Sequence, residues 1–289
     1  MQDELWKKII EQLFPDFVSF FMPGLAEIVD FSKAYTFLDK ELEGLFADSA
    51  ESKRRVDKLA KVFLKNGQEQ WILIHAEVQG YYDKAFTERM WSYFYRIYDK
   101  YKQKIAAIAV FAEDKPNWMP NAYEYQFFQT KLSYSYPVYK ILDQDEIELK
   151  QSDNPFAMVI LAALYALRSK KTDEERKLHF KLLLTDLLFK KGYETAKIRA
   201  VFHFVNTLIK MNDELTQAKF FEEAKNMATL NKKIELLSDF EEVAMREGNK
   251  KGRKETASKM KADGMAPELI QKYTGLSLEE IAQLEPQAE

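Results

Sequence analysis

The chain has 289 residues, of which 46% are hydrophobic, 31% charged and 14% aromatic, with 9 Gly and 8 Pro. This composition is that of an ordinary globular protein with one large or two modest domains, and it excludes collagen-like and Pro-rich disordered classes. The lack of cysteine excludes a disulfide scaffold, a thiol nucleophile and a Cys-ligated metal. A net charge of −3 leaves nucleic-acid binding open until the distribution of charge is considered.

The sequence contains no evident membrane span or secretory signal. The longest uncharged apolar stretch, 156–167, is shorter than the roughly 20 residues that cross a bilayer. Residues 1–14 carry charges throughout, unlike a signal peptide. We therefore expect no membrane association and a cytoplasmic location.

The first 145 residues have the pattern of an α/β unit. Helical spacing of apolar residues predicts a helix over Asp3–Leu13, with a second candidate at Ala34–Leu45. Asn66-Gly67 predicts a hairpin, and the aromatic-rich segment Lys84–Tyr101 predicts a long helix. A hairpin, a helix and a buried strand in succession indicate a βαβ crossover onto a mixed sheet. Strands are predicted at Val56–Leu64, Gln70–Gln79, Ile105–Phe111, Tyr123–Phe128 and Leu132–Ile141.

The remainder of the chain is predicted to be helical. Thr172 and Glu175 form a capping box that would open a helix ending near Lys191, and another helix is expected over Thr195–Met211. After a basic stretch, Pro267 would start a tail helix, Gly275 would end it, and Ser277–Glu280 is a second capping box. We therefore divide the chain into a core at 1–145, a helical region at 146–247, and a basic linker with a small helical tail at 248–289.

Two carboxylates of the predicted hairpin are candidates for chemistry. Asp57 lies near the start of its first strand, and His75, Glu77 and Gln79 share one face of the second because side chains alternate along a strand. Two converging carboxylates form a hard-oxygen site suited to Mg²⁺ or Mn²⁺. Such a metal lowers the pKa of bound water and neutralises charge on a phosphodiester.

The loop of the hairpin decides whether these carboxylates can converge. A regular two-residue loop at Asn66-Gly67 would set Asp57 opposite Ala76, on the face away from Glu77. We therefore predict a one-residue bulge or a loop of odd length. From spacing alone, the more frequent interpretation is of solvent-facing polar residues on a half-exposed hairpin.

Several segments of the chain resemble one nuclease family. The succession FLDKEL (37–42), VDKL (56–59), IHAEVQG (74–80) and ERMWSYFYRIYDKY (88–101) is similar to the Rpn family of recombination-promoting, transposase-like nucleases in the PD-(D/E)XK superfamily. The resemblance covers residues 1–145 well and the helical remainder more loosely. The tail segment GMAPELIQKYTGLSLEEIAQL (264–284) resembles the short C-terminal repeats of these proteins.

The resemblance implies a restriction-endonuclease-like mixed sheet flanked by helices, with a Mg²⁺ site. The superfamily's acid corresponds to Asp57 and its E-x-K to Glu77-Val78-Gln79, where glutamine replaces the usual lysine, as it does in this family. Glutamine can orient a water but brings no charge. Glu41 matches a metal-binding acid of the first helix, with Asp39 as its competitor.

Basic residues around Asp57 point to DNA as the partner. Lysine and arginine beside a metal site attract a phosphate backbone, although such runs are more often a solvated strand face. Arg89 is a further candidate for a phosphate contact, with a surface or ion-pairing role as its alternative. The cluster consists of Lys53, Arg54, Arg55, Lys58, Lys61 and Lys65.

For three other features of the sequence, a structural role is the more frequent one. His75 is more often a hydrogen-bond partner of a carboxylate than a general base. The aromatic residues of 84–101 recur at helical intervals, so we predict core packing rather than base stacking. The tail has helix-turn-helix spacing, but Glu279 and Glu280 would repel phosphate, which favours docking or dimerisation.

The sequence thus predicts a Mg²⁺-dependent DNA endonuclease that promotes recombination or transposition-like events. Asp57, Glu77 and Gln79 would be catalytic, and Glu41 would complete the metal shell. The alternative is a degenerate nuclease-fold protein that binds DNA or protein partners without cleavage. Two coordinated cuts would favour a homodimer, although no heptad marks an interface.

Overall fold

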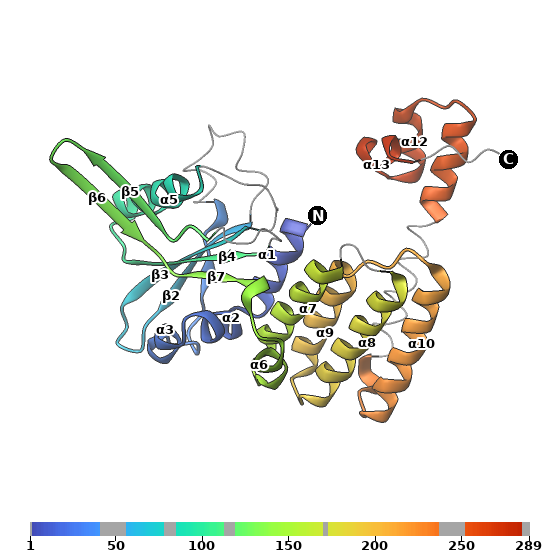
Figure 1. Cartoon of the computed structure of the whole chain (residues 1–289), viewed down its shortest axis with the longest axis horizontal. Helices are drawn as coiled ribbons and strands as arrows, with labels where there is room; N and C mark the ends of the chain where they lie inside the picture. The colour runs from blue at the N-terminus through green and yellow to red at the C-terminus, as the bar shows by residue number, and fades with distance from the viewer. Residues whose placement is uncertain are drawn as a thin grey trace. The chain divides into compact units, whose positions relative to one another are not determined.

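The computed structural model describes residues 2–40, 56–77, 85–112, 119–169, 173–236 and 252–284, with side chains at all of these positions except 2, 56, 57, 75–77 and 234. The chain divides into two compact units, Met1–Phe220 and Phe221–Glu289. The first unit holds a mixed sheet and most of the described helices (Figure 1).

Five strands of the described chain form one mixed sheet, and a mixed sheet was predicted from the sequence. Their order is β1-β2-β3-β4-β7, with antiparallel pairing on the β1 side of β3 and parallel pairing on the β4 side. The parallel pairing follows from the crossover helix α5 (Phe86–Tyr101), which returns the chain from the end of β3 to the start of β4. The strands are β1 (Thr36–Phe37), β2 (Val56–Phe63), β3 (Glu69–Glu77), β4 (Ile105–Phe111) and β7 (Val138–Lys140).

Both faces of the sheet are covered, because consecutive residues of β3 are buried. Ile72, Leu73 and Ile74 each have no exposed surface. Leu73 packs against Tyr93 and Ile97 of α5, in a cluster that also contains Leu59 and Trp71. On the other face, α1 (Gln2–Gln12) lies against β2. The run of consecutive apolar residues in β3 is therefore explained by the position of this strand between two layers of helices.

The N-terminal helices α1, α2 (Phe14–Phe21) and α3 (Pro23–Ile28) join the sheet to the helical region. The helix predicted over Asp3–Leu13 is confirmed as α1, with Ile9 and Ile10 buried. The Trp6 ring meets the Phe204 ring edge-on with 5.2 Å between centroids, and Phe17 meets Phe156 at 5.1 Å.

The helix predicted over Ala34–Leu45 is wrong in its first part. Thr36 and Phe37 form β1 at the sheet edge and pair with Lys61 and Ala60. β-branched and aromatic residues favour a pleated, half-buried surface, and here the edge of β2 provides one. Phe37 also packs on Phe14, with ring centroids 5.2 Å apart. Residues 41–45 lie outside the described residues.

A separate two-stranded ribbon consists of β5 (Ala122–Phe127) and β6 (Thr130–Ser135). The strand predicted at Tyr123–Phe128 is confirmed except at its last residue, which belongs to the turn. The segment Leu132–Ile141 is divided between the ribbon and the sheet because Tyr136-Pro137 interrupts it. Proline has no backbone N–H to continue a ladder, so β6 and β7 join different sheets.

The helical part of the first unit is built around α7, which is buried on nearly all sides. Helices α7, α8 and α9 pack against one another side by side (Figure 1). The N-cap predicted at Thr172 is wrong: Asp173 caps α8, and its carboxylate accepts a hydrogen bond from the Arg176 backbone N–H at 2.8 Å. The elements of this part are η2 (Ile141–Asp143), α6 (Glu146–Gln151), α7 (Pro155–Ser169), α8 (Glu174–Lys190) and α9 (Thr195–Leu208). The boundary between the two units falls within α10 (Glu214–Leu230), and η3 (Ile234–Leu236) belongs to the second unit.

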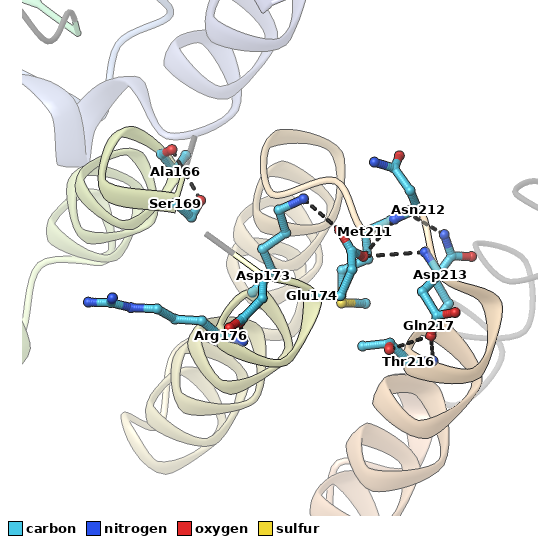
Figure 2. A network of polar contacts seen from close by, with 11 residues as sticks. Ala166, Ser169, Asp173, Glu174, Arg176, Met211, Asn212, Asp213, Thr216 and Gln217 are labelled. Atoms are coloured by element: carbon cyan, nitrogen blue, oxygen red, sulfur yellow. Dashed lines mark hydrogen bonds and ion pairs between the residues drawn. The ribbon is translucent and has the colours of Figure 1, made fainter. Parts of the chain in front are cut away.

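Polar contacts fix the connection between α9 and α10 to the start of α8 (Figure 2). Glu174 Oε2 accepts hydrogen bonds from the backbone N–H groups of Asn212 and Asp213, at 2.7 and 3.3 Å. Asp213 in turn accepts from the Thr216 N–H at 2.8 Å, within the first turn of α10. Each carboxylate satisfies helix-end or loop donors, so this network has a structural role.

The described part of the second unit ends in three short helices: residues 252–262, α12 (Pro267–Thr274) and α13 (Leu278–Ala282). They enclose Ala257, Ile270, Leu276 and Ile281. Most of the predicted basic linker is therefore helical within the described residues. The capping box at Ser277 and the helix end at Gly275 are confirmed.

In the ranges that the structure covers, no helix is both long and apolar enough to cross a membrane.

Glu146 provides a test of the joint between α6 and α7. Its carboxylate accepts hydrogen bonds from Lys150 at 2.6 Å, Tyr165 at 2.7 Å and Arg168 at 2.6 Å. The Lys150 hydrogen bond is the largest of the causes that lower the pKa of Glu146 from 4.5 to about 2. A carboxyl group with a lowered pKa stabilises the fold above its usual pKa, and this contribution is lost as the pH falls through the lowered value.

We therefore expect Glu146→Gln to lower the free energy of unfolding by about 1–2 kcal/mol at neutral pH. Urea titrations from pH 7 to pH 2 should show this difference shrinking below pH 4.5, the usual pKa of the group. Glu148→Gln, at an exposed position of the same helix, is the control. A difference that stays constant with pH would contradict the assignment.

Candidate functional site

The β2–β3 hairpin has a loop of odd length. Leu64 and Gln68 close the loop through a hydrogen bond from the Leu64 N–H to the Gln68 carbonyl at 2.8 Å. Lys65, Asn66 and Gly67 therefore form the loop, and Gly67 has a φ of +86°. Three-residue hairpin loops favour glycine at the left-handed position, which explains why the asparagine-glycine pair does not form the two-residue turn. The predicted odd-length loop is confirmed.

This loop sets Asp57 opposite His75 rather than opposite Ala76. Because side chains alternate, positions 57, 75 and 77 belong to one face of the sheet. The pair Leu59 and Leu73 on that face contacts α5, so it is the face that α5 covers. The register therefore allows the two predicted carboxylates to share a site, although their side chains lie outside the described ones.

A lysine that the sequence analysis did not single out lies in the same row as Glu77. A row here means the residues that are paired with one another across neighbouring strands of the sheet. Glu77 pairs with Phe111 of β4, and Phe111 pairs with Lys140 of β7. Val138 packs on the α5 side, whereas the ring of Tyr139 meets Phe21 of α2, so alternation returns Lys140 to the α5 face. Its side chain is only 3% exposed. The sheet thus holds a buried cation in ladder register with Glu77.

Arg89 lies near this row, and its predicted contact with a phosphate stays a prediction. Its guanidinium is 5.2 Å from the centroid of the Phe86 ring, and that ring is 5.1 Å from the Phe111 ring. Burial raises the pKa of Tyr136, and the positive charge of Arg89 opposes part of the rise. The first turn of α5 therefore brings a second cation toward the end of the sheet where Glu77 lies.

Lys58, predicted as a DNA contact, is buried in the structure. The side chain is 1% exposed and forms ion pairs with Glu11 of α1 and with Asp39. Its ammonium also lies 4.7 Å from the centroid of the Phe37 ring. Lys58 alternates with Asp57 and faces α1, so it cannot meet a phosphate at the Asp57 face without leaving a buried pair. We therefore assign Lys58 a structural role and no longer expect it to contact DNA.

The same ion pair removes Asp39 as a metal ligand beside Asp57, because its carboxylate is held by Lys58 on the opposite face.

Among the other members of the basic cluster, Lys61 lies 3.8 Å from Glu69, and Lys65 donates to the Glu27 carbonyl at 2.7 Å. The remaining predicted site residues lie outside the described residues and stay predictions: Glu41, Lys53, Arg54, Arg55 and Gln79.

Among the described side chains, no group of three or more His, Asp or Glu residues could hold a metal ion. The carboxylates of Asp57 and Glu77 are not among them, so the Mg²⁺ site stays a prediction. Comparisons with protein-family models, curated proteins and solved structures found no match. The functional interpretation of this site therefore depends on its residues and their register.

Lys58 offers a test that separates a structural cation from a DNA contact. Removing one partner of a buried ion pair leaves the other charges uncompensated, at a cost of about 3 kcal/mol. We expect Lys58→Met to lower the free energy of unfolding by about this amount and, under the hypothesis that the chain binds DNA, to leave the salt dependence of that binding unchanged. Urea titration and fluorescence anisotropy at several salt concentrations would measure the two effects.

Lys61→Met is the matched control, since Lys61 lies on the same strand but is 31% exposed. Its unfolding free energy should change by less than about 1 kcal/mol. Unchanged stability of Lys58→Met, together with a shallower salt dependence, would restore Lys58 as a phosphate ligand.

Proposed function

We propose that the chain is a Mg²⁺-dependent DNA endonuclease with a restriction-endonuclease-like core, as its resemblance to the Rpn family implies. The observation that supports this proposal most directly is the register of the hairpin, which assigns Asp57 and Glu77 to one face and one end of the sheet. A two-residue loop would have separated them. The residues that carry the resemblance thus occupy positions at which they could act together.

The donor set fits a divalent metal. Two carboxylates at the end of a sheet offer hard oxygen ligands of the kind that Mg²⁺ and Mn²⁺ prefer. When bound, such an ion supplies an activated water and neutralises charge on the phosphodiester. In this proposal Asp57 and Glu77 hold the ion, Glu41 completes its shell, and Gln79 orients the attacking water through hydrogen bonds.

Two cations near this sheet end support a phosphate substrate. Phosphodiester hydrolysis develops negative charge around the phosphorus, and preorganised positive groups in a buried site stabilise it. Gln79 brings no charge, but Lys140 is buried in the row of Glu77, and Arg89 lies beside Phe86 in the first turn of α5. A phosphate approaching the carboxylates would thus meet a positive environment. DNA cleavage of this kind would promote recombination or transposition-like events.

The alternative is a degenerate nuclease fold that binds DNA or a protein without cutting. The glutamine at position 79 is the feature that favours it, since a neutral side chain there removes the charge that most superfamily members use. A binding protein should keep its DNA affinity when Asp57 is replaced, and it should not require Mg²⁺. Metal dependence therefore separates the two functions.

The decisive experiment is cleavage of supercoiled plasmid by the full chain with Mg²⁺, Mn²⁺ or EDTA. We expect nicked and linear products with either metal and none with EDTA. Asp57→Asn and Glu77→Gln should each reduce the rate by about 1000-fold or more, because each removes a charged metal ligand. Asp99→Asn is the control, since Asp99 is an exposed acid on α5 that pairs with Lys102.

Cleavage that survives both site substitutions would assign the activity to a different site or to a contaminant. If the wild-type chain shifts DNA on a gel but never cuts it, the degenerate binding protein replaces the nuclease.

Lys140 gives a second, independent prediction about the site. Replacing a buried donor that stabilises transition-state charge lowers the rate of the chemical step by about 100-fold. We expect Lys140→Met to reduce the single-turnover cleavage rate by about this factor, with little change in DNA affinity, and Lys140→Arg to restore part of the rate. Circular dichroism melting checks that the variants fold. Lys102→Met is the exposed control, and equal rates for Lys140→Met and wild type would exclude Lys140 from the chemistry.

A further inference from the structure

The tip of the β5–β6 ribbon exposes two phenylalanine rings. Phe127 is 72% exposed and Phe128 is 84% exposed. Phe127 pairs with Thr130, so Phe128 and Gln129 form a two-residue loop at the tip. The ribbon extends beyond α5, away from the strands of the main sheet (Figure 1). These rings bury little surface within the chain, so core packing does not explain why phenylalanine occupies these two positions.

The backbone at Phe128 is strained as well. Its φ is +52°, in the left-handed region that a bulky side chain rarely adopts. Two-residue hairpin loops normally place glycine, asparagine or aspartate at such positions. Phe128 therefore costs free energy in the isolated fold without any compensating burial. Strain kept at an exposed position indicates a functional requirement for the side chain.

The chemistry around the two rings favours nucleic acid over other partners. From Tyr125 to Lys131 the tip carries two glutamine amides and one lysine but no carboxylate. The adjacent acid, Glu124, accepts a hydrogen bond from Ser133 Oγ at 2.6 Å on the ribbon itself. Apolar wedges flanked by amides and a cation are the set with which architectural proteins enter the minor groove and unstack base steps.

We propose that the β5–β6 tip is a DNA wedge, in which Phe127 and Phe128 insert between base steps of duplex DNA. Lys131 contacts the adjacent phosphates, and the amides of Gln126 and Gln129 face the groove. This inference depends on DNA being the partner under the proposed function, but it does not depend on cleavage. It specifies how the duplex is held and deformed.

Aromatic packing fixes the base of the ribbon on α5. The Trp91 and Tyr123 rings stack at 6.3 Å with 5° between their planes, and Phe94 meets Tyr134 at 4.7 Å. Tyr134 continues to Tyr136 at 5.4 Å, within the cluster that contains Phe86 and Phe111. Because Phe111 is the ladder partner of Glu77, the wedge is connected through packed rings to the row of the candidate site.

The test uses a short duplex that contains 2-aminopurine, whose fluorescence rises when its base is unstacked. Ca²⁺ replaces Mg²⁺ to prevent cleavage of the probe. The wild-type chain should bind with a rise in fluorescence, whereas the double variant Phe127→Ala/Phe128→Ala should lose the rise and bind at least about tenfold more weakly. Leu215→Ala is the control, since Leu215 is an 82% exposed apolar residue of α10.

Phe128→Gly separates function from stability. Glycine relieves the strain at positive φ, so this variant should melt at the same or a higher temperature than wild type while the fluorescence rise falls. A lower melting temperature with an unchanged fluorescence rise would overturn the proposal, because the ring would then have a structural role.

The remaining outcomes distinguish the wedge from the nuclease. A wedge signal in a chain that never cuts DNA would support this inference and contradict the endonuclease. Cleavage and binding that are unaffected by the double variant would overturn the wedge alone, and a wild-type chain that binds no DNA would overturn both. If light scattering shows a wild-type dimer that the double variant dissociates, with DNA binding unchanged, the tip contacts a second copy instead.

Discussion

The three-residue loop at Lys65–Gly67 is the constraint on which the candidate site depends. Side chains alternate with a period of two, so one residue more or less in a hairpin loop exchanges the faces of a whole strand. With Gly67 in the left-handed region, Asp57 is paired with His75, and its position falls on the face of Glu77. The same register sends Lys58 to the opposite face. A local backbone property of one glycine thus determines which charged residues can meet.

The two faces of the sheet use their charged residues in different ways. Toward α1, Lys58 forms a closed arrangement with Glu11 and Asp39, a buried pair whose loss would leave uncompensated charge. Toward α5, Lys140 is buried in the row of Glu77. The first arrangement joins β2, α1 and the residues that follow β1, which explains its place in the interior. The second lies at the ends of β3, β4 and β7.

The strongly patterned elements could be predicted from the sequence, and the errors have physical causes. Helix α5 and the strand Ile105–Phe111 were predicted correctly because long periodic or continuous apolar segments leave few alternatives. Thr36-Phe37 was predicted as helix because its strand partner lies more than twenty residues further along the chain. Such non-local pairing overrides local preference.

The errors at the site are of two kinds. The role of Lys58 could have been found, because alternation places it on the face of Ala60 and Val62, which are both buried. The position of Lys140 could not, since it comes from β7 pairing with β4 across a connection that a single sequence does not specify. Phe128 gave no turn signal at all. Phenylalanine at positive φ breaks the local rules, and departures of this kind are expected where function, rather than folding, selects the residue.

The crossover connection explains why positions 57, 77 and 140 and the first turn of α5 lie at one end of the sheet. A helix that joins two parallel strands runs back along them, so its N-terminus lies beside the carboxyl ends of the strands. The contact between Phe86, in the first turn of α5, and Phe111, at the end of β4, shows this arrangement. A helix N-terminus carries partial positive charge. Under the proposed nuclease function, this partial charge would attract an approaching phosphate to the end of the sheet where position 77 lies.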